Sequence, residues 1–179
     1  MAATHVALLR GINVGTAKRV AMADLRDLMT GLGFRDVRTL LNSGNVIFTA
    51  PRRAGDPGRR IEKAIEKRLG LTSRVTVMTA AELDVAVRGN TLLKLATHPS
   101  RLMVGALATR DDRSRLEPLT RKRWGPERLA LGERVCYLWC PEGIIKSPLM
   151  KEVARAVGDA ITSRNWSTIQ KLQGLVQAE

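Results

Sequence analysis

Two short stretches of the chain carry polar side chains and glycines of the kinds that hold anions in proteins. Arg10 and Asn13 lie in the segment RGINVG, directly after an apolar run, and Ser43 and Asn45 flank Gly44 in a second turn. Guanidinium, amide and hydroxyl groups donate hydrogen bonds, and glycine turns leave backbone N–H groups accessible to a phosphate or carboxylate. The same groups can stabilise an oxyanion that develops during a reaction.

A third polar stretch runs from Ser163 to Thr168 and precedes an apolar-periodic segment. The first turn of a helix presents free N–H groups and favours anions, which makes this stretch a further candidate. The predicted ligand-binding residues, with the serine and the threonine in supporting roles, are Arg10, Asn13, Ser43, Asn45, Arg164, Asn165 and Thr168. Each of them also has a purely structural interpretation, as a turn residue, a helix cap or an ion-pair partner.

The candidate residues do not define a reaction. The three stretches contain no histidine and no pair of carboxylates, so a general base is not evident. The glycine spacing fits neither a dinucleotide fingerprint nor a phosphate-binding loop with its lysine, and we expect no cofactor. Cys136 and Cys140 lack zinc-ligand spacing and are expected to be core thiols, while His5 and His98 are far apart, so we expect no metal site.

The chain is strongly basic. Lys plus Arg number 30 against 17 for Asp plus Glu, a formal net charge of +13, which is compatible with a nucleic-acid partner. Two basic clusters would carry such binding: Arg52, Arg53, Arg59, Arg60 and Lys63, and then Arg121, Lys122 and Arg123. Aromatic residues make up 3%, too few for the stacking surfaces of an RNA-recognition sheet, and an arginine-rich solvated surface explains the charge equally well.

Three functions therefore remain open: binding of a small anionic ligand, binding of nucleic acid without sequence preference, and a structural or protein-interaction module. No apolar run reaches the roughly 18 residues of a spanning helix, and the N-terminus lacks a signal-peptide pattern, so we expect a cytoplasmic protein without membrane contact. The sequence does not predict an oligomeric state.

The hydrophobic pattern predicts the elements that position these residues. Gly33 and Gly70 are expected to end two helices. Asp56 is expected to cap the helix that Gly70 ends and Ser147 to cap another, each with proline following, and Thr79 with Glu82 to form a capping box. The predicted strands are residues 4–9, 37–41, 46–49, 74–78, 102–108, 128–131, 135–140 and 160–163. The predicted helices are residues 22–32, 57–69, 80–87, 113–123, 148–157 and 168–176.

The element order β-α-β-β-α-β occurs twice, which predicts an α+β protein of two tandem ferredoxin-like subdomains with a C-terminal helix. We expect the first subdomain at residues 1–79, a connecting helix and linker at 80–100, and the second at 101–179. In a split βαβ unit the end of the first strand and the turn between the second and third share one edge of the sheet. Arg10, Asn13 and Asn45 should therefore lie near one another.

The motifs also resemble those of a known family. The segment VALLRGINVG at residues 6–15, then MADL, GF, VRT and SGNV, is similar to the opening of a bacterial family catalogued as domain of unknown function 1697 (DUF1697). The segment RNWST at residues 164–168, followed by Lys171-Leu172, resembles its C-terminal motif. The resemblance spans nearly the whole chain, with the weakest part between about Pro51 and Cys140. It implies two ferredoxin-like α+β subdomains and no established activity.

The chain departs from the family pattern at two places. Thr16 stands where members often have a second glycine after the asparagine-valine-glycine. Ser147-Pro148-Leu149 stands where they often have serine-lysine-leucine, and Lys146 precedes the serine instead. If that lysine contacts a ligand in relatives, the sequence leaves open whether Lys146 replaces it.

Overall fold

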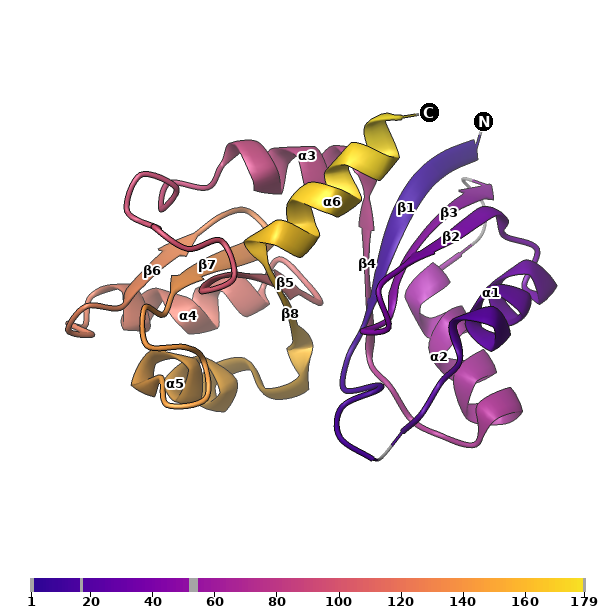
Figure 1. Ribbon diagram of the computed structural model, residues 1–179, viewed down its shortest axis with the longest axis horizontal. Coiled ribbons are helices and arrows are strands. Elements are labelled where there is room, and N and C mark those ends of the chain that lie inside the picture. The colour runs from indigo at the N-terminus through magenta and orange to yellow at the C-terminus, as the bar shows by residue number, and fades with distance from the viewer. Residues whose placement is uncertain (1, 17, 52–54, 179) are drawn as a thin grey trace. The chain divides into compact units, whose positions relative to one another are not determined.

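The computed structural model describes residues 2–16, 18–51 and 55–178, and the chain forms two compact units. The first unit runs through Leu83 and includes the end of the chain from Val176, and the second is Asp84–Leu175. Each unit contains one four-stranded sheet in which every pair of neighbouring strands is antiparallel (Figure 1). The coarse prediction of a two-part α+β protein is confirmed.

The first unit has the strand order β2-β3-β1-β4, with β1 inside the sheet. Its elements are β1 (Ala2–Leu9), α1 (Met22–Gly31), β2 (Arg35–Leu40), β3 (Asn45–Pro51), α2 (Pro57–Leu69) and β4 (Val75–Thr79). They are followed by α3 (Ala80–Arg88), which crosses the boundary between the units in the sequence.

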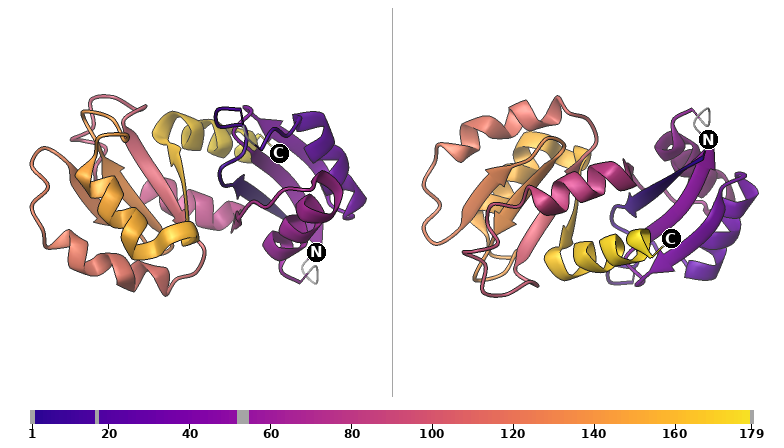
Figure 2. Two further views of the ribbon diagram at one scale, coloured as in Figure 1. Left: turned by 90° about the horizontal axis from the view of Figure 1, so that it is seen from below. Right: turned by 90° about the horizontal axis from the view of Figure 1, so that it is seen from above.

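The core of the first unit lies between the sheet and the two helices α1 and α2, which cover the same face (Figure 2). Ala7 and Leu9 alternate along β1 and pack with Phe48 of β3, because successive strand side chains point to opposite faces. The predicted start of α2 is confirmed: Asp56 accepts a hydrogen bond from the N–H of Arg59 at 3.1 Å. Gly70, at φ 65°, ends the helix as predicted.

The second unit has the corresponding strand order, β6-β7-β5-β8. Its elements are β5 (Leu102–Leu107), α4 (Asp112–Thr120), β6 (Arg128–Leu131), β7 (Val135–Trp139), α5 (Pro148–Val157), a short 3-10 turn (Gly158–Ala160), β8 (Ile161–Asn165) and α6 (Trp166–Gln177).

Both faces of the second sheet are covered. The helices α4 and α5 lie on one face and α3 and α6 on the other (Figure 1). The α4–α5 side holds a core that includes Cys136 and Leu138, and both cysteines are fully buried as predicted. On the opposite side, the hydroxyl of Tyr137 donates to the carbonyl oxygen of Ala86 at 2.6 Å, which ties α3 to the sheet. Two-sided burial explains why β5 and β7 are continuous apolar runs.

Three predicted elements differ from the structure at functionally relevant positions. Leu41 was predicted in a strand but lies in the following turn, at φ 58°. β8 extends to Asn165 instead of ending at 163, because its pairing with β5 continues through Arg164 opposite Val104. Helix α4 ends at Thr120, so the basic residues 121–123 lie in a loop and not in a helix.

Candidate functional site

The end of β1 is joined to two neighbouring loops by backbone hydrogen bonds. The N–H of Leu9 donates to the carbonyl oxygen of Gly44 at 2.8 Å, and the N–H of Arg10 donates to that of Arg74 at 2.9 Å. The carbonyl oxygen of Arg10 accepts from the hydroxyl of Ser73, also at 2.9 Å. The loop after β1, the β2–β3 turn and the loop before β4 therefore meet at one end of the first sheet.

Asn13 braces two of these loops with its side chain. Its amide nitrogen donates to the carbonyl oxygens of Val20 at 2.8 Å and Asn42 at 2.7 Å, and its amide oxygen accepts from the N–H of Val20 at 2.8 Å. The backbone of Asn13 has φ 54°, a left-handed conformation that asparagine tolerates better than most residues. Both amide hydrogens are thus engaged in holding the loop.

Asn45 has a similar role inside the β2–β3 turn. It is fully buried, and its amide nitrogen donates to the carbonyl oxygen of Leu40 at 2.8 Å and the hydroxyl of Ser43 at 2.9 Å. Ser43 itself is exposed, and Gly44 between them has φ 81°. The sequence predicted that Asn13 and Asn45 donate to a ligand, whereas their amide hydrogens here close and brace turns.

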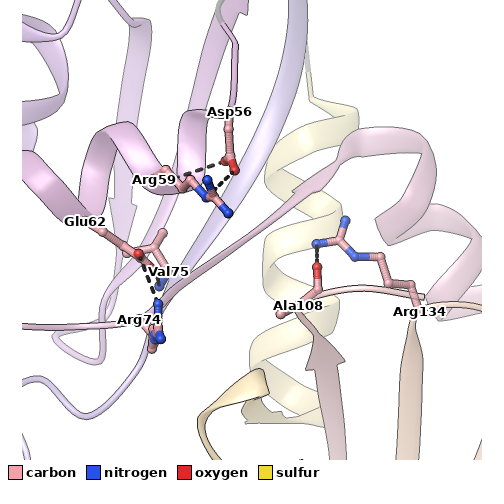
Figure 3. A network of polar contacts seen from close by, with 7 residues as sticks. All are labelled: Asp56, Arg59, Glu62, Arg74, Val75, Ala108 and Arg134. Carbon is pink, nitrogen blue, oxygen red and sulfur yellow. Dashed lines mark hydrogen bonds and ion pairs between the residues drawn. The ribbon is translucent and has the colours of Figure 1, made fainter. Parts of the chain in front are cut away.

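Exposed cationic side chains lie near the hydrogen bonds made by Asn13 and Asn45. Arg10, Lys18 and Arg74 all have exposed side chains at this end of the sheet, and the ammonium of Lys18 donates to the carbonyl oxygen of Thr72 at 2.8 Å. Glu62 of α2 accepts from the N–H of Val75 at 2.8 Å and lies 3.6 Å from the guanidinium of Arg74 (Figure 3). We call Arg10, Lys18 and Arg74, with Asn13, Ser43 and Asn45, the loop-end cluster.

Lys18 and Arg74 were not predicted from the sequence. Arg74 was detectable in principle, because an antiparallel β4 must begin beside the end of β1. Lys18 had no comparable signal, because its position depends on the left-handed backbone at Asn13 and at Lys18 itself, where φ is 50°.

The remaining candidates form a separate group in the second unit, at the junction of β8 and α6. The side-chain oxygen of Asn165 accepts from the N–H of Thr168 at 2.9 Å, which is the helix-capping alternative, and Thr168 is buried. Arg164 donates to the carbonyl oxygen of Ser163 at 2.9 Å. Burial lowers the pKa of Arg164 to about 10, since a guanidinium loses hydration there. Trp166 is buried, which agrees with a packing role for its ring.

Among the described residues, no group of three or more His, Cys, Asp and Glu side chains has an arrangement that would hold a metal ion. Within the same residues, no helix is long and apolar enough to cross a membrane.

Comparisons with known proteins place the chain in a family without a known activity. A search of curated proteins found no match. The structure of a conserved bacterial protein, SP0830 from Streptococcus pneumoniae, is similar with a TM-score of 0.76 at 20% identity, over 98% of this chain and 99% of that one. At this identity the likeness concerns the fold.

The model of the family described as "Protein of unknown function (DUF1697)" matches residues 2–137. The match includes the N-terminal motif and ends before the C-terminal motif at residues 164–172. The matched residues make up well over half of the chain, and the chain belongs to the DUF1697 family.

Proposed function

We propose that the loop-end cluster binds a small anionic ligand that bears a phosphate or carboxylate group. The observation that carries the proposal is the joining of three loops by hydrogen bonds, which gathers the cations Arg10, Lys18 and Arg74 at one end of the sheet. Arginine offers a planar fork of donors and lysine a mobile point charge, both suited to phosphate and carboxylate.

The glycines of the same loop support this proposal. Gly11 and Gly15 have φ of 69° and 61°, and, apart from the adjacent residues of the chain, no described atom lies within 4 Å of where a Cβ would be at either one. Alternating left-handed positions bring successive backbone N–H groups toward a common side, an arrangement that receives anions. In this proposal Arg10 is the principal donor, Ser43 supports it, and Asn13 with Asn45 holds the loops in place.

We further propose Arg164 as an anion-binding residue of the second unit, with Asn165 and Thr168 fixing the start of α6 beside it. The lowered pKa supports this role, because a guanidinium that has lost hydration gains more from an anion than a fully solvated one does. The proposal assigns binding without a reaction, since neither group holds a histidine or a pair of carboxylates.

The finer description of the fold is also a proposal. We infer that each unit is ferredoxin-like, with boundaries near residues 79 and 101 and a connecting helix between them, in a cytoplasmic protein. The strand orders β2-β3-β1-β4 and β6-β7-β5-β8, each with two helices between the strands in the order βαββαβ, support this inference.

The test uses inorganic phosphate and citrate as probes, with binding followed by NMR chemical shifts of the backbone amides. Shifts should concentrate at residues 10–16 and 42–44 and disappear in Arg10→Ala. The matched control is Arg35→Ala, because Arg35 is exposed and lies at the opposite end of the sheet, paired with Thr49. Equal binding by both variants, or shifts confined to other regions, would contradict the proposal.

Nucleic-acid binding is the second candidate function, supported by the net charge of +13 and by exposed Arg121, Lys122 and Arg123. In the other basic cluster, Arg52 and Arg53 lie outside the described residues, and Arg59 is paired with Asp56 at 3.5 Å. Binding of oligonucleotides over a salt series should be compared between the native protein and Arg10→Ala/Arg164→Ala. If the affinity for oligonucleotides falls equally and steeply with salt in the native protein and the double variant, binding is assigned to the general basic surface. Loss specific to the folded double variant assigns it to the candidate residues.

If neither phosphate, citrate nor oligonucleotide binds at low salt, a structural or protein-interaction module is the remaining function. The brace formed by Asn13 and Asn45 would then serve the stability of the loops only.

A further inference from the structure

A cavity of about 420 Å³ lies in the second unit, at the loop between α4 and β6. Its lining includes the cations Lys122, Arg123 and Arg128, the ring of Trp124 and the acid Glu127, with Thr120, Gly125 and Leu129. This volume is within the usual range of small-molecule pockets, roughly 300–1,000 Å³. The cavity involves none of the residues of the proposed anion site.

The indole ring of Trp124 is held in a fixed position. Its N–H donates to the carbonyl oxygen of Leu119 at 2.9 Å, and the side chain packs against the core of the unit while remaining partly exposed. The ammonium of Lys122 lies 5.9 Å from the ring centroid, near the outer limit of a cation–π contact. The ring therefore presents a preformed flat surface that a weakly held lysine covers.

The charge around this ring is mainly positive. Lys122 and Arg123 are exposed, and no ion pair joins either to a carboxylate within the described part of the chain. Arg128 donates to the carbonyl oxygens of Gly125 and Glu127, at 2.6 and 2.8 Å, which fixes the loop without neutralising the charge.

The carboxylate of Glu127 is engaged elsewhere. Glu127 is 5% exposed, and its oxygen accepts from the N–H of Leu149 at 3.0 Å, at the start of α5. A carboxylate that contacts the N-terminus of a helix is stabilised by the helix dipole, so the contact with Leu149 partly offsets the negative charge of Glu127. Glu127 lies in the cavity lining together with three cations, so the charge around the cavity is positive overall.

We propose that this cavity binds a nucleotide, with its planar base on the ring of Trp124 and its phosphate held by Lys122, Arg123 and Arg128. Stacking of bases on aromatic rings combined with phosphate contacts from cations is the common chemistry of nucleotide and single-strand recognition. The inference goes beyond the anion site of the first unit and does not depend on it. Free nucleotides and single-stranded nucleic acid share this chemistry.

The test measures binding of a fluorescent adenosine monophosphate and of a labelled short oligothymidylate at low salt. Lys122→Gln/Arg123→Gln should weaken binding of at least one probe tenfold or more, while Lys171→Gln, an exposed charge on α6 at the opposite face of the sheet, should not. Trp124→Leu should weaken binding and Trp124→Phe should retain most of it. Because Trp124→Leu removes core packing, its folding is checked by circular dichroism, and the charge variants keep the test decisive if it fails to fold.

The two probes distinguish a free nucleotide from single-stranded nucleic acid as the ligand. Binding of the mononucleotide identifies a free nucleotide as the ligand, and binding of the oligonucleotide only identifies a single strand. The proposal is overturned if neither probe binds, or if Lys122→Gln/Arg123→Gln and Lys171→Gln weaken binding equally. One further pair of results would overturn it: unlabelled inorganic phosphate displaces the probe as effectively as unlabelled nucleotide does, and the folded Trp124→Leu variant binds the probe like the native protein. Together these results would show that the base is not recognised.

Discussion

The amide nitrogen of Asn13 lies 2.7 Å from the carbonyl oxygen of Asn42 and joins the loop after β1 to the β2–β3 turn. The two residues are 29 positions apart in the sequence. The same side chain also makes two hydrogen bonds with the backbone of Val20, so one asparagine fixes the loop internally and against its neighbour. The placement of Arg10 depends on this brace, because Arg10 begins the same loop.

Replacement of Asn13 should therefore be costly. Asn13→Ala loses three hydrogen bonds and places alanine at φ 54°, and we expect the free energy of unfolding to fall by roughly 2–4 kcal/mol. Asn13→Gly loses the same bonds but accepts the backbone conformation, and should be about 1 kcal/mol more stable than the alanine variant. Urea denaturation measures both, and equal stability of the two variants would exclude backbone conformation as a contributor.

Gly44 and Gly15 provide a second comparison, because both have positive φ but differ in their surroundings. A Cβ at Gly44 would lie 2.7 Å from Cδ1 of Ile12 and 2.8 Å from the Cβ of Leu9, whereas one at Gly15 would have no described atom within 4 Å apart from those of its chain neighbours. Gly15→Ala should cost about 1–2 kcal/mol through its backbone conformation. Gly44→Ala should cost roughly 1–3 kcal/mol more through overpacking.

Thermal unfolding followed by circular dichroism distinguishes the two glycine variants. The loss of melting temperature should be clearly larger for Gly44→Ala than for Gly15→Ala. A loss of the same size in both would show that the turn moves to make room, and that Leu9 and Ile12 do not fix its position.

A third prediction concerns the start of α5 in the second unit. Glu127 accepts from the N–H of Leu149 at 3.0 Å, and the hydroxyl of Ser147 accepts from the N–H of Met150 at 2.9 Å. Glu127→Ala leaves a buried donor without its partner and should lower the free energy of unfolding by roughly 1–3 kcal/mol. Glu127→Gln keeps an acceptor and should lose less. Denaturant titration measures the free energy of unfolding of both variants. A Glu127→Gln variant as unstable as Glu127→Ala would contradict the prediction.

These residues show how far the sequence could predict the structure. Asp56, Ser147 and Thr79 with Glu82 were identified as helix caps, because a capping residue and its partner lie within a few positions of each other. The contact from Glu127 to Leu149 spans 22 positions and has no local signature. Its existence depends on how the fold brings the loop before β6 to the start of α5.

The candidate site likewise has features that the sequence predicted and features that it did not. The nearness of Arg10, Asn13 and Asn45 followed from strand order, and the hydrogen bonds at the end of the first sheet agree with it. The engagement of both asparagine amides did not follow, because it depends on the left-handed backbone at Asn13 and the register of a single turn. The last strand was predicted to end at residue 163, whereas the β5–β8 ladder continues through Arg164 and Asn165 and places both in the strand.

The last prediction concerns stability in alkaline solution. Complete burial raises the pKa of the Cys136 thiol to about 12, from an ordinary value of 9.0. Between these values the unfolded chain releases the thiol proton and the native chain keeps it. The unfolded state then binds fewer protons, so the free energy of unfolding must fall as pH rises above 9.

Cys136→Ala removes this contribution. The variant will lose packing at every pH, but its stability should decline less steeply than that of the native protein, with the difference between them shrinking by about 1 kcal/mol from pH 8 to pH 10. Burial also raises the pKa of Tyr137 to about 12, with a smaller contribution from the charge of Cys136, and burial raises the pKa of Cys140. Both groups remain in the variant, so the comparison measures Cys136 together with its effect on Tyr137. Urea denaturation at intervals from pH 8 to 10.5 measures the two slopes. Parallel declines would show that the thiol of Cys136 titrates equally in the native and unfolded states, which its burial between the sheet and α4 and α5 argues against.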